Sequence, residues 1–415
     1  MTIFTPDSPE DVVATVKWAA AEELPLEIVG HGSKRGIGRP INASHTLDLS
    51  RLTGVTLYEP AELVLSARAG TALSEIERLL EANHQKLAFE PMDYAPLLGG
   101  APGGGTIGGA LAANLSGPRR IKVGAARDHV LGVEAASGRG EAFKSGGRVV
   151  KNVTGYDLSK GMAGSWGTLA VLTRVTFKVL PAAETEATLL LRGLSDSQAT
   201  EAMAAALGSS AEASGAAHLP APSAARVLAG GLGHRAATAI RIEGVALSVA
   251  YRLERVRDLL NPSAPVQEEL AADESRRLWR DIRDCVPFAD VSERPVWRVS
   301  MTPSEGWRLV VELRKFAGAD GFYDWQGGLV WLRMEADPEA HQVRRLIRSF
   351  GGGHATLVRA SLAQRAATDV FEPQPPALAA LAQRLKHGFD PKGVLNPGRM
   401  GASAAADSPL QAAAG

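Results

Sequence analysis

The stretch from Gly99 to Gly109 constrains the fold of this chain more than any other feature. It contains seven glycines around Pro102 and Thr106, and it runs into a helix-compatible segment from Ala110 to Leu115. Glycine has no Cβ, so successive backbone N–H groups can turn toward one point. A nest of N–H groups beside a helix start can bind an anion such as a diphosphate. A simple turn is the alternative, so the neighbouring motifs have to decide.

The same loop also matches the G-x-G-x-x-G pattern of Rossmann dinucleotide sites, at Gly103, Gly105 and Gly108. Asp128 follows at about the spacing of the acid that binds the ribose in that pattern. However, the glycines follow a proline-rich loop rather than an apolar strand. Asp128 precedes the apolar run Val130 to Val133, whereas the ribose-binding acid should end a strand. We therefore favour a different phosphate-binding fold.

A second glycine cluster follows a short predicted strand near the N-terminus. Leu26 to Val29 forms the strand pattern, and the sequence GHGSKRG comes directly after it, from Gly30 to Gly36. Its backbone N–H groups, one serine hydroxyl and two cations could all meet a phosphate, although a turn with solvated charges is the other interpretation. Two such clusters in one domain predict a long ligand whose diphosphate is held from two sides.

Two further blocks complete a recognisable pattern: residues 150–158 (VKNVTGYDL) with 164–169, and residues 389–400 (FDPKGVLNPGRM). In this order the four blocks resemble the FAD-binding family that includes vanillyl-alcohol oxidase and D-lactate dehydrogenase. More narrowly, over about residues 1–400, the chain resembles the E-type FAD-binding subunit of bacterial glycolate oxidase. That narrower resemblance uses residues 297–300, 325–331 and 352–356.

The resemblance implies that FAD is bound by residues of these blocks, with the diphosphate across the first two loops and Asn396 returning from the C-terminus to the flavin. The candidates are Gly30, Gly32, Ser33, Lys34, Pro102, Gly104, Thr106, Ile107, Gly108, Gly109, Asn114, Asn152, Thr154, Gly155, Tyr156, Asp157, Gly164, Ser165, Gly167, Thr168, Leu169 and Asn396. Relatives that link flavin covalently use a histidine in the first loop. Lys34 aligns with that histidine, so we expect non-covalent FAD.

The resemblance also implies a small 2-hydroxy acid substrate, with glycolate oxidised to glyoxylate. Such a substrate needs a cation for its carboxylate and a base for its hydroxyl proton. Arg298 is the candidate cation, because a guanidinium matches a carboxylate bidentately, and His354 is the candidate base. A structural role remains the alternative for each of them. For Tyr323, Trp325 and Trp331, core packing is favoured over lining the pocket.

One departure from the family leaves the function open. Longer hydroxyacid dehydrogenases of the family carry a His-x-Gly-Asp-Gly-Asn-x-His-like motif in the cap, and this sequence has none. The chain could oxidise the hydroxy acid at its own FAD, or it could be a flavin-bearing electron-transfer or assembly subunit beside a catalytic sister flavoprotein. A UDP-sugar enolpyruvate reductase is a more distant alternative.

The resemblance implies a hetero-oligomer with a sister FAD subunit and an iron–sulfur subunit. The single cysteine, Cys285, cannot by itself ligate an iron–sulfur cluster, and no metal site is predicted in the chain. Lys and Arg (45) balance Asp and Glu (45), so no basic excess points to a nucleic-acid partner. With no apolar run of membrane-spanning length and no signal-like N-terminus, we expect a cytoplasmic protein, or one held peripherally at the inner membrane face by partners.

Alternating strand and helix patterns predict an α+β protein with more than one unit. We expect a two-lobed FAD-binding domain of the vanillyl-alcohol oxidase type at 1–181 and an α+β cap at 182–385. Residues 386–400 would return to the flavin, and 401–415 would form a disordered tail. Within this frame we predict a strand at 147–150, a loosely determined loop at about 208–236 and one charged helical run from Val266 to Cys285.

Overall fold

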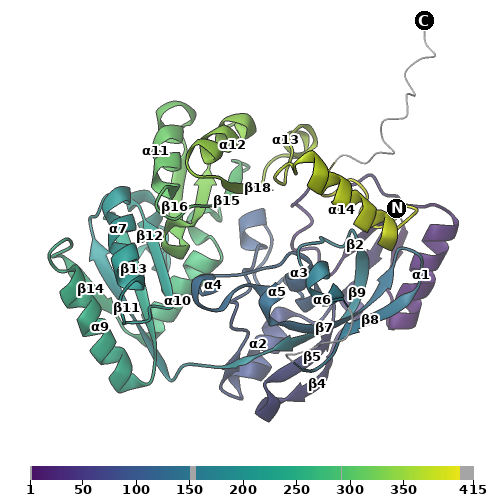
Figure 1. Ribbon diagram of the computed structural model, residues 1–415, viewed down its shortest axis with the longest axis horizontal. Helices are drawn as coiled ribbons and strands as arrows, with labels where there is room; N and C mark the ends of the chain where they lie inside the picture. The colour runs from purple at the N-terminus through teal and green to yellow at the C-terminus, as the bar shows by residue number, and fades with distance from the viewer. Residues whose placement is uncertain (1, 150–155, 291, 402–415) are drawn as a thin grey trace, which may run out of the picture.

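The computed structural model describes residues 2–149, 156–290 and 292–401 of the chain. It confirms an α+β fold and consists of two lobes (Figure 1). The N-terminal lobe holds two main sheets with short helices around them. The C-terminal lobe holds a single large sheet with helices packed on it, and the chain then returns to the first lobe.

The first sheet of the N-terminal lobe is parallel, in the order β1-β3-β2. Its strands are β1 (Thr2–Phe4), β2 (Leu26–Val29) and β3 (His45–Asp48). Helix α1 (Pro9–Ala21) begins after a capping box, in which the Ser8 hydroxyl accepts from the Asp11 N–H and the Asp11 carboxylate accepts from the Ser8 N–H. Buried residues of α1 share a core with the ends of β2 and β3, so the helix fixes the strand that leads into the first glycine loop.

The second sheet is antiparallel, in the order β4-β5-β9-β7-β8. Its strands are β4 (Val55–Glu59), β5 (Val64–Arg68), β7 (Val130–Ser137), β8 (Ala142–Gly146) and β9 (Ala170–Lys178). Around it lie α2 (Leu73–Glu81), α3 (Ile107–Ala112), α4 (Arg120–Val123), α5 (Ala126–His129) and α6 (Leu158–Met162), and β6 (Gln85–Lys86) pairs with β10 (Leu180–Pro181). The strand predicted at 147–150 is wrong: the strand is β8, and it ends at Gly146, whose φ is +72°.

The C-terminal lobe is built on an eight-stranded antiparallel sheet in the order β14-β11-β13-β12-β16-β17-β15-β18. Its strands are β11 (Thr185–Arg192), β12 (Gly215–Leu219), β13 (Ala237–Gly244), β14 (Gln267–Leu270), β15 (Val296–Met301), β16 (Asp320–Asp324), β17 (Leu329–Arg333) and β18 (Gly353–Arg359). One face is covered by α7 (Asp196–Leu207) and α9 (Ala246–Leu260) over one half and by α11 (Gly306–Ala317) and α12 (Ala340–Ser349) over the other. The other face joins a hydrophobic core shared with the N-terminal lobe.

Two predictions for this lobe were wrong. The expected loop at 208–236 contains the central strand β12, together with α8 (Ala221–Ala224). Its Gly-Ala-Ala sequence has little strand propensity, and its full burial between β13 and β16 decides the conformation. The expected helical run from Val266 is divided into the edge strand β14 and helix α10 (Ala272–Arg283), because pairing with β11 overrides the helical pattern.

After β18 the chain crosses back over the N-terminal lobe through α13 (Leu362–Ala367) and α14 (Pro376–Phe389), drawn in yellow-green and yellow in Figure 1. The Leu26 N–H then donates to the Val394 carbonyl (2.8 Å), and the Asn396 N–H donates to the Leu26 carbonyl (2.9 Å). The C-terminal segment is thereby attached beside β2. The domain limits at 181, 385 and 400 stay predictions, and most of the predicted tail lies outside the described residues.

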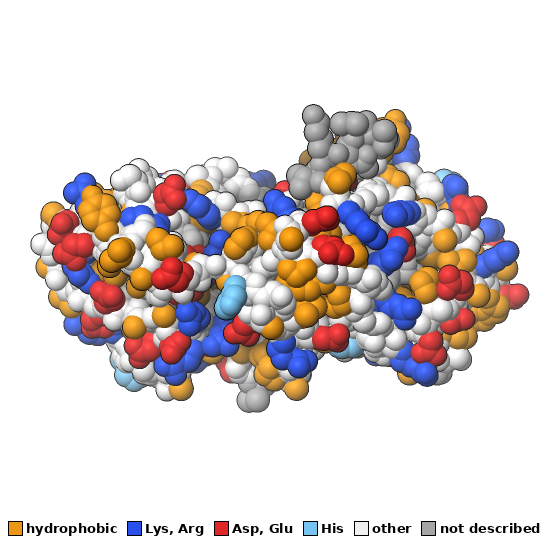
Figure 2. Space-filling model, turned by 90° about the horizontal axis from the view of Figure 1, so that it is seen from below, with side chains coloured by type: hydrophobic (Ala, Val, Ile, Leu, Met, Phe, Trp, Pro, Cys, Tyr) orange, Lys and Arg blue, Asp and Glu red, His pale blue; other side chains and the backbone are white. Residues whose placement is uncertain are grey.

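Charged side chains of both signs are mixed over the face shown in Figure 2, in keeping with the balanced composition. Among the described helices, none is long and apolar enough to cross a membrane.

Candidate cofactor and substrate site

A groove in the N-terminal lobe brings together segments that lie far apart in the sequence. They are the end of β2 with the first glycine loop, the start and end of α3, the turn before β9, and the C-terminal segment. The lining residues are Ile28, Val29, Gly30, His31, Gly32, Ser33, Lys34, Arg35, Leu49, Ala69, Thr106, Gly108, Gly109, Ala112, Ala113, Trp166, Gly167, Ala170, Leu172 and Arg399. Eight of the residues proposed for FAD are therefore adjacent, although they come from three of the sequence blocks.

Glycines allow the walls of this groove to approach closely. A Cβ on Gly30 would lie 2.6 Å from the Thr106 hydroxyl oxygen, and one on Gly109 would lie 3.3 Å from the Lys34 amino nitrogen. Gly108 lines the groove and also lies against the chain after β5, because a Cβ there would lie 2.7 Å from the Ala69 Cβ. Gly108 thus lets α3 pack on the chain after β5, while Gly30 and Gly109 keep the groove open.

The structure also explains why the Rossmann interpretation fails. Thr106 caps α3, its hydroxyl accepting from the Gly109 N–H (3.2 Å), and this helix follows a loop instead of a strand. Asp128 is used locally, its carboxylate accepting from the Ala125 N–H (2.9 Å) at the start of α5. Asp128 is therefore not presented at a strand end, as a ribose-binding carboxylate would be.

Two cations face this groove: Arg399, which is buried, and Lys34, which is partly buried. Burial lowers the pKa of Lys34 to about 8, with Asp93 opposing the shift and Arg399 adding to it. Burial also lowers the pKa of Arg399 to about 10. Within the described residues neither side chain forms an ion pair with a carboxylate. Buried cations without acidic partners fit an anionic ligand such as the FAD diphosphate.

Asn396 is placed between the groove walls. Its side-chain carbonyl accepts from the Ile28 N–H (2.8 Å), and its amide donates to the Trp166 carbonyl (2.8 Å). The side chain is buried, at 1% exposure. Asn396 therefore joins β2 to the turn before β9 and holds two lining residues in position.

Other residues proposed for FAD do not line the groove. Ile107 and Leu169 are in the hydrophobic core, Pro102 is exposed, and Gly104 lies against Ser33. Ser165 and Thr168 bond to each other within their turn, Tyr156 is exposed, and Asp157 caps α6. Asn152, Thr154 and Gly155 lie outside the described residues.

A second cavity of about 160 Å³ adjoins the groove. It is lined by Tyr94, Ala113, Asn114, Leu115, Ser116, Gly164, Trp166, Arg298, Thr356, Val358, Phe371 and Met400. Ala113 and Trp166 line both spaces, so the cavity and the groove share a wall. Asn114 and Gly164, proposed for FAD, line this cavity, and Arg298 enters it from the other lobe.

The register of the large sheet explains where Arg298 lies. Arg298 on β15 is opposite Trp331 on β17 and Thr356 on β18, on the sheet face that packs against the N-terminal lobe. Its guanidinium carbon lies 5.0 Å from the centre of the Trp325 ring, and that of Arg120 lies 4.9 Å from it. Among the described residues, neither arginine pairs with a carboxylate. Two guanidiniums beside one indole make this end of the seam strongly cationic.

His354 lies two residues before Thr356 on β18, opposite Ser300 on β15. Burial lowers the pKa of His354, and the nearby charges of Arg298 and Arg120 lower it further, while Glu372 opposes them. The imidazole is therefore neutral at physiological pH and can accept a proton. His354 is exposed and does not line the cavity that contains Arg298, so its role as the base stays a prediction.

Several residues of this region were missed by the sequence analysis. Arg399 ends the Asn-Pro-Gly-Arg segment that drew attention only to Asn396, so its position was a usable signal. Arg120 and Trp166 carry no local pattern. Trp325, expected in the core, is buried, and its ring N–H donates to the Gly117 carbonyl (3.0 Å) across the seam.

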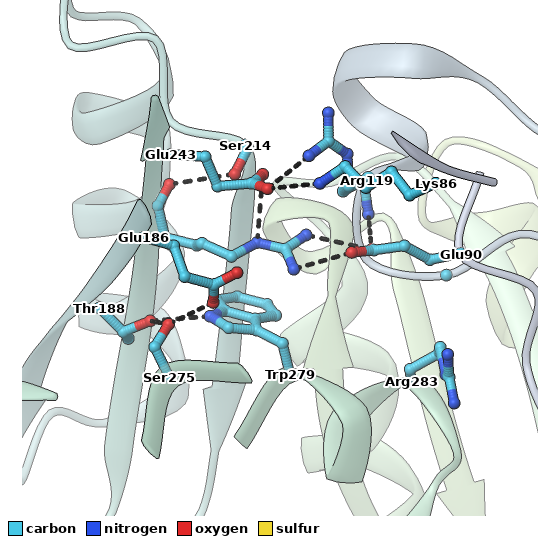
Figure 3. Close-up of polar contacts among 12 residues, drawn as sticks. Lys86, Glu90, Arg119, Glu186, Thr188, Ser214, Glu243, Ser275, Trp279 and Arg283 are labelled. Carbon is cyan, nitrogen blue, oxygen red and sulfur yellow. Dashed lines mark hydrogen bonds and ion pairs between the residues drawn. The ribbon is translucent and has the colours of Figure 1, made fainter. Parts of the chain in front are cut away.

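A second charged cluster lies further along the seam between the lobes (Figure 3). Arg241 is 2% exposed and donates to both carboxylate oxygens of Glu90 (2.9 and 3.1 Å). Glu243 accepts from Lys86 (2.8 Å) and Arg119 (2.5 Å). Burial alone would raise the pKa of Glu243, but Arg241, Lys86 and Arg119 hold it well below its usual range. Each of these charged side chains forms an ion pair with a side chain of opposite charge, from the same lobe or from the other one.

The comparisons with known proteins agree with this geometry. Residues 2–146 match the family model described as FAD binding domain. Glycolate oxidase subunit GlcE of Escherichia coli (strain K12) is 35% identical over 395 residues, which is 95% of this chain and 97% of that protein. The chain belongs to the GlcE family of glycolate oxidase subunits. It is accordingly an FAD-dependent oxidoreductase subunit.

Two further proteins show how far the sequence and the fold are shared. Glycolate oxidase subunit GlcD of Bacillus subtilis (strain 168) is 27% identical over 189 residues, which is 45% of this chain and 38% of that protein. A crystal structure of p-cresol methylhydroxylase with substrate bound has the same fold, with a TM-score of 0.71 at 15% identity over 97% of this chain and 88% of that one. The two-lobed arrangement is therefore shared far more widely than the sequence.

Proposed function

We propose that this GlcE-family chain binds FAD non-covalently and oxidises a small 2-hydroxy acid, glycolate, to glyoxylate. One observation carries the proposal: the cavity that contains Arg298 shares the wall of Ala113 and Trp166 with the cofactor groove. A substrate held by Arg298 would thus lie beside a cofactor in the groove. The presence of lysine where relatives carry the linking histidine supports non-covalent binding.

The chain's own residues supply the substrate chemistry. Arg298 binds the carboxylate, and the neutral His354 takes the hydroxyl proton as the α-carbon is oxidised. Trp325 holds Arg298 in place by stacking, and the Asp324 carboxylate accepts from the Trp325 N–H (2.7 Å) to fix that turn. Bound FAD would supply the hydride acceptor.

We further propose that the electrons leave through partner chains, a sister FAD subunit and an iron–sulfur subunit. The single cysteine is fully buried, and burial raises its pKa well above the usual value, so it offers no thiolate for a cluster. The GlcE relative is itself named as a subunit of glycolate oxidase, which supports a hetero-oligomer.

The absence of a His-x-Gly-Asp-Gly-Asn-x-His-like motif favours one alternative, in which this chain transfers electrons or supports assembly and a sister flavoprotein oxidises the acid. Purification of the chain alone and with the two proposed partners, followed by glycolate-dependent dye reduction, separates the two. We expect weak or no turnover by the chain alone and full turnover by the complex. Full turnover by the lone chain would refute the partner requirement.

The mode of FAD binding has a separate test. Denaturation of the purified chain should release yellow cofactor into the supernatant. Flavin that stays with the precipitated chain would show a covalent link, and a preparation that never contains flavin would refute the cofactor assignment.

A further inference from the structure

Helix α14 carries an apolar stripe that no other part of the described chain covers. None of its 14 residues is buried, and Figure 1 shows the helix on the outside of the N-terminal lobe. Leu378, Leu381 and Leu385 share one face, because they are three and four positions apart, and they are 52%, 54% and 46% exposed. A helix of this length is only marginally stable in water unless an apolar face packs against something. The stripe therefore indicates a binding surface.

The C-terminal end of α14 is held next to the cofactor groove. The Lys386 amino group forms an ion pair with the Asp390 carboxylate. It also donates to the carbonyls of Thr168 (2.6 Å) and Leu395 (3.0 Å). Thr168 directly follows Gly167, which lines the groove. A protein bound on α14 would thus lie beside the wall of the groove in which we place FAD.

The charge of α14 is one-sided. The sequence from Pro376 to Phe389 contains no acidic residue. Arg384 and His387 are exposed, and among the described residues neither forms an ion pair. A complementary surface would therefore present carboxylates around an apolar centre. Pairing of α14 with α14 of a second copy would bring basic residues together without any carboxylate, so a different chain fits the surface better.

Two other occupants fit the stripe less well. Helices that lie on membrane surfaces are rich in Lys and Arg on their polar face, whereas Arg384 is the one fixed cation of α14 outside an ion pair among the described residues. Residues 402–415 contain a single large apolar side chain, Leu410, which is too few to cover three leucines.

We propose that α14 is the docking surface for the electron-accepting partner chain, and that this partner presents an apolar patch rimmed by carboxylates. The three leucines would pack on the patch, and Arg384 would pair with a carboxylate of the rim. The inference rests on the proposed function, because that function requires a chain that takes electrons from FAD. Electron transfer is fastest between cofactors that lie close together, and a partner on α14 lies beside the groove wall.

The test measures the Kd of the FAD-loaded chain for each proposed partner, with the iron–sulfur chain and the sister flavoprotein immobilised in turn. Leu381→Glu places a charge in the stripe. Leu247→Glu is its matched control, because Leu247 is an exposed leucine on α9 of the other lobe. Arg384→Glu and Arg255→Glu form a second pair, since Arg255 is an exposed arginine on α9. Flavin absorbance gives the FAD content of each variant, and urea denaturation shows that each is folded.

We expect Leu381→Glu to raise the Kd for the iron–sulfur chain at least about tenfold, as loss of a central apolar contact does, with FAD content at the wild-type level. Arg384→Glu should raise the Kd less, and its effect should shrink at high salt because the lost pair lies at the rim. Leu247→Glu and Arg255→Glu should leave the Kd close to wild type.

An unchanged Kd in Leu381→Glu, an equal rise in Leu247→Glu, or no partner binding by the FAD-loaded wild type would overturn the proposal. An effect on the sister flavoprotein alone would overturn it in favour of that chain. Loss of binding on deletion of residues 402–415 would assign docking to that segment instead. Binding of the wild type, but not of Leu381→Glu, to phosphatidylglycerol vesicles with the partner Kd unchanged would assign the stripe to a membrane. A wild-type chain that binds its partner but contains no FAD would refute the proposed function and leave the docking surface in place.

Discussion

The neighbouring residues Arg119 and Arg120 point into two very different regions of the seam between the lobes. Arg119 joins the cluster in which Arg241, Glu90 and Glu243 pair their charges across the interface. Arg120 joins Arg298 beside Trp325, and within the described residues that pair has no carboxylate partner. Two adjacent positions at the start of α4 thus belong to a closed ion network and to an open cationic site.

The difference separates the charged side chains that stabilise the fold from those that are available to bind a ligand. A buried charge is costly unless it is paired, so a fully paired cluster is stable in the isolated chain. Within the described residues, the buried Arg399 and the partly buried Lys34, Arg120 and Arg298 have no carboxylate partner. A dinucleotide diphosphate and a substrate carboxylate would supply the missing negative charges.

The largest effect is expected on breaking the paired cluster. Arg241→Met removes the guanidinium between Glu90 and Glu243 and leaves the mostly buried Glu90 carboxylate without its ion-pair partner. We expect the free energy of unfolding to fall by about 3–5 kcal/mol. Arg257→Met is the control, because its pairs with Glu254 and Glu269 are partly exposed and contribute about 0–1 kcal/mol. Urea denaturation measures the free energy of unfolding of both variants. Equal decreases would show that the paired cluster stabilises the chain no more than an exposed ion pair does.

The next largest effect concerns the proposed base in the open site. His354→Asn should reduce kcat in the complex by about 10²–10⁴-fold, the usual contribution of general base catalysis. In the wild type, the lowered pKa of His354 means that the imidazole becomes protonated only at acidic pH. The kcat/KM should therefore fall as the pH drops below about 6.5, the usual pKa of histidine. If His354→Asn kept the wild-type turnover and the same decrease of kcat/KM at acidic pH, His354 would not be the catalytic base.

A smaller effect is expected for the pH dependence of FAD binding. The pKa of Lys34 is lowered to about 8 in the chain without ligand, so the amine loses its proton above that pH. A bound diphosphate would raise this pKa again, and binding would then take up a proton. We expect the FAD Kd to rise by at most about tenfold per pH unit above pH 8. Lys34→Met should bind more weakly and show no such rise; an unchanged slope in that variant would assign the proton to another group.

The sequence predicted the parts of the site that depend on local chain geometry. The glycine loops at Gly30 and Gly104 and the Asn-Pro-Gly-Arg segment could be found because glycine and proline fix the backbone wherever they occur. The α+β class followed from alternating patterns. Strand β12 could not be predicted, because Ala216 and Ala217 become strand only through burial between β13 and β16.

The arrangement of charges at the seam could not be predicted from the sequence either. Arg120 and Arg298 are 178 positions apart, and only the packing of both on Trp325 makes them neighbours. The sequence alone does not show that Arg119 forms an ion pair with a carboxylate whereas Arg120, among the described residues, does not. Asn396 was found for its place in a motif, but its role as a link between Ile28 and Trp166 required the structure.

The central claim is that the unpaired cations of this chain bind a hydroxy acid next to its own FAD. The most direct test is anaerobic mixing of glycolate with the complex, while flavin bleaching is followed in time. The account predicts that one phase, equal in amount to this chain's flavin, slows by about tenfold to 150-fold in Arg298→Ala, because a charge-assisted pair of about 1.5–3 kcal/mol is lost. Bleaching that is identical in wild type and Arg298→Ala, with both complexes intact and fully loaded with FAD, would contradict it.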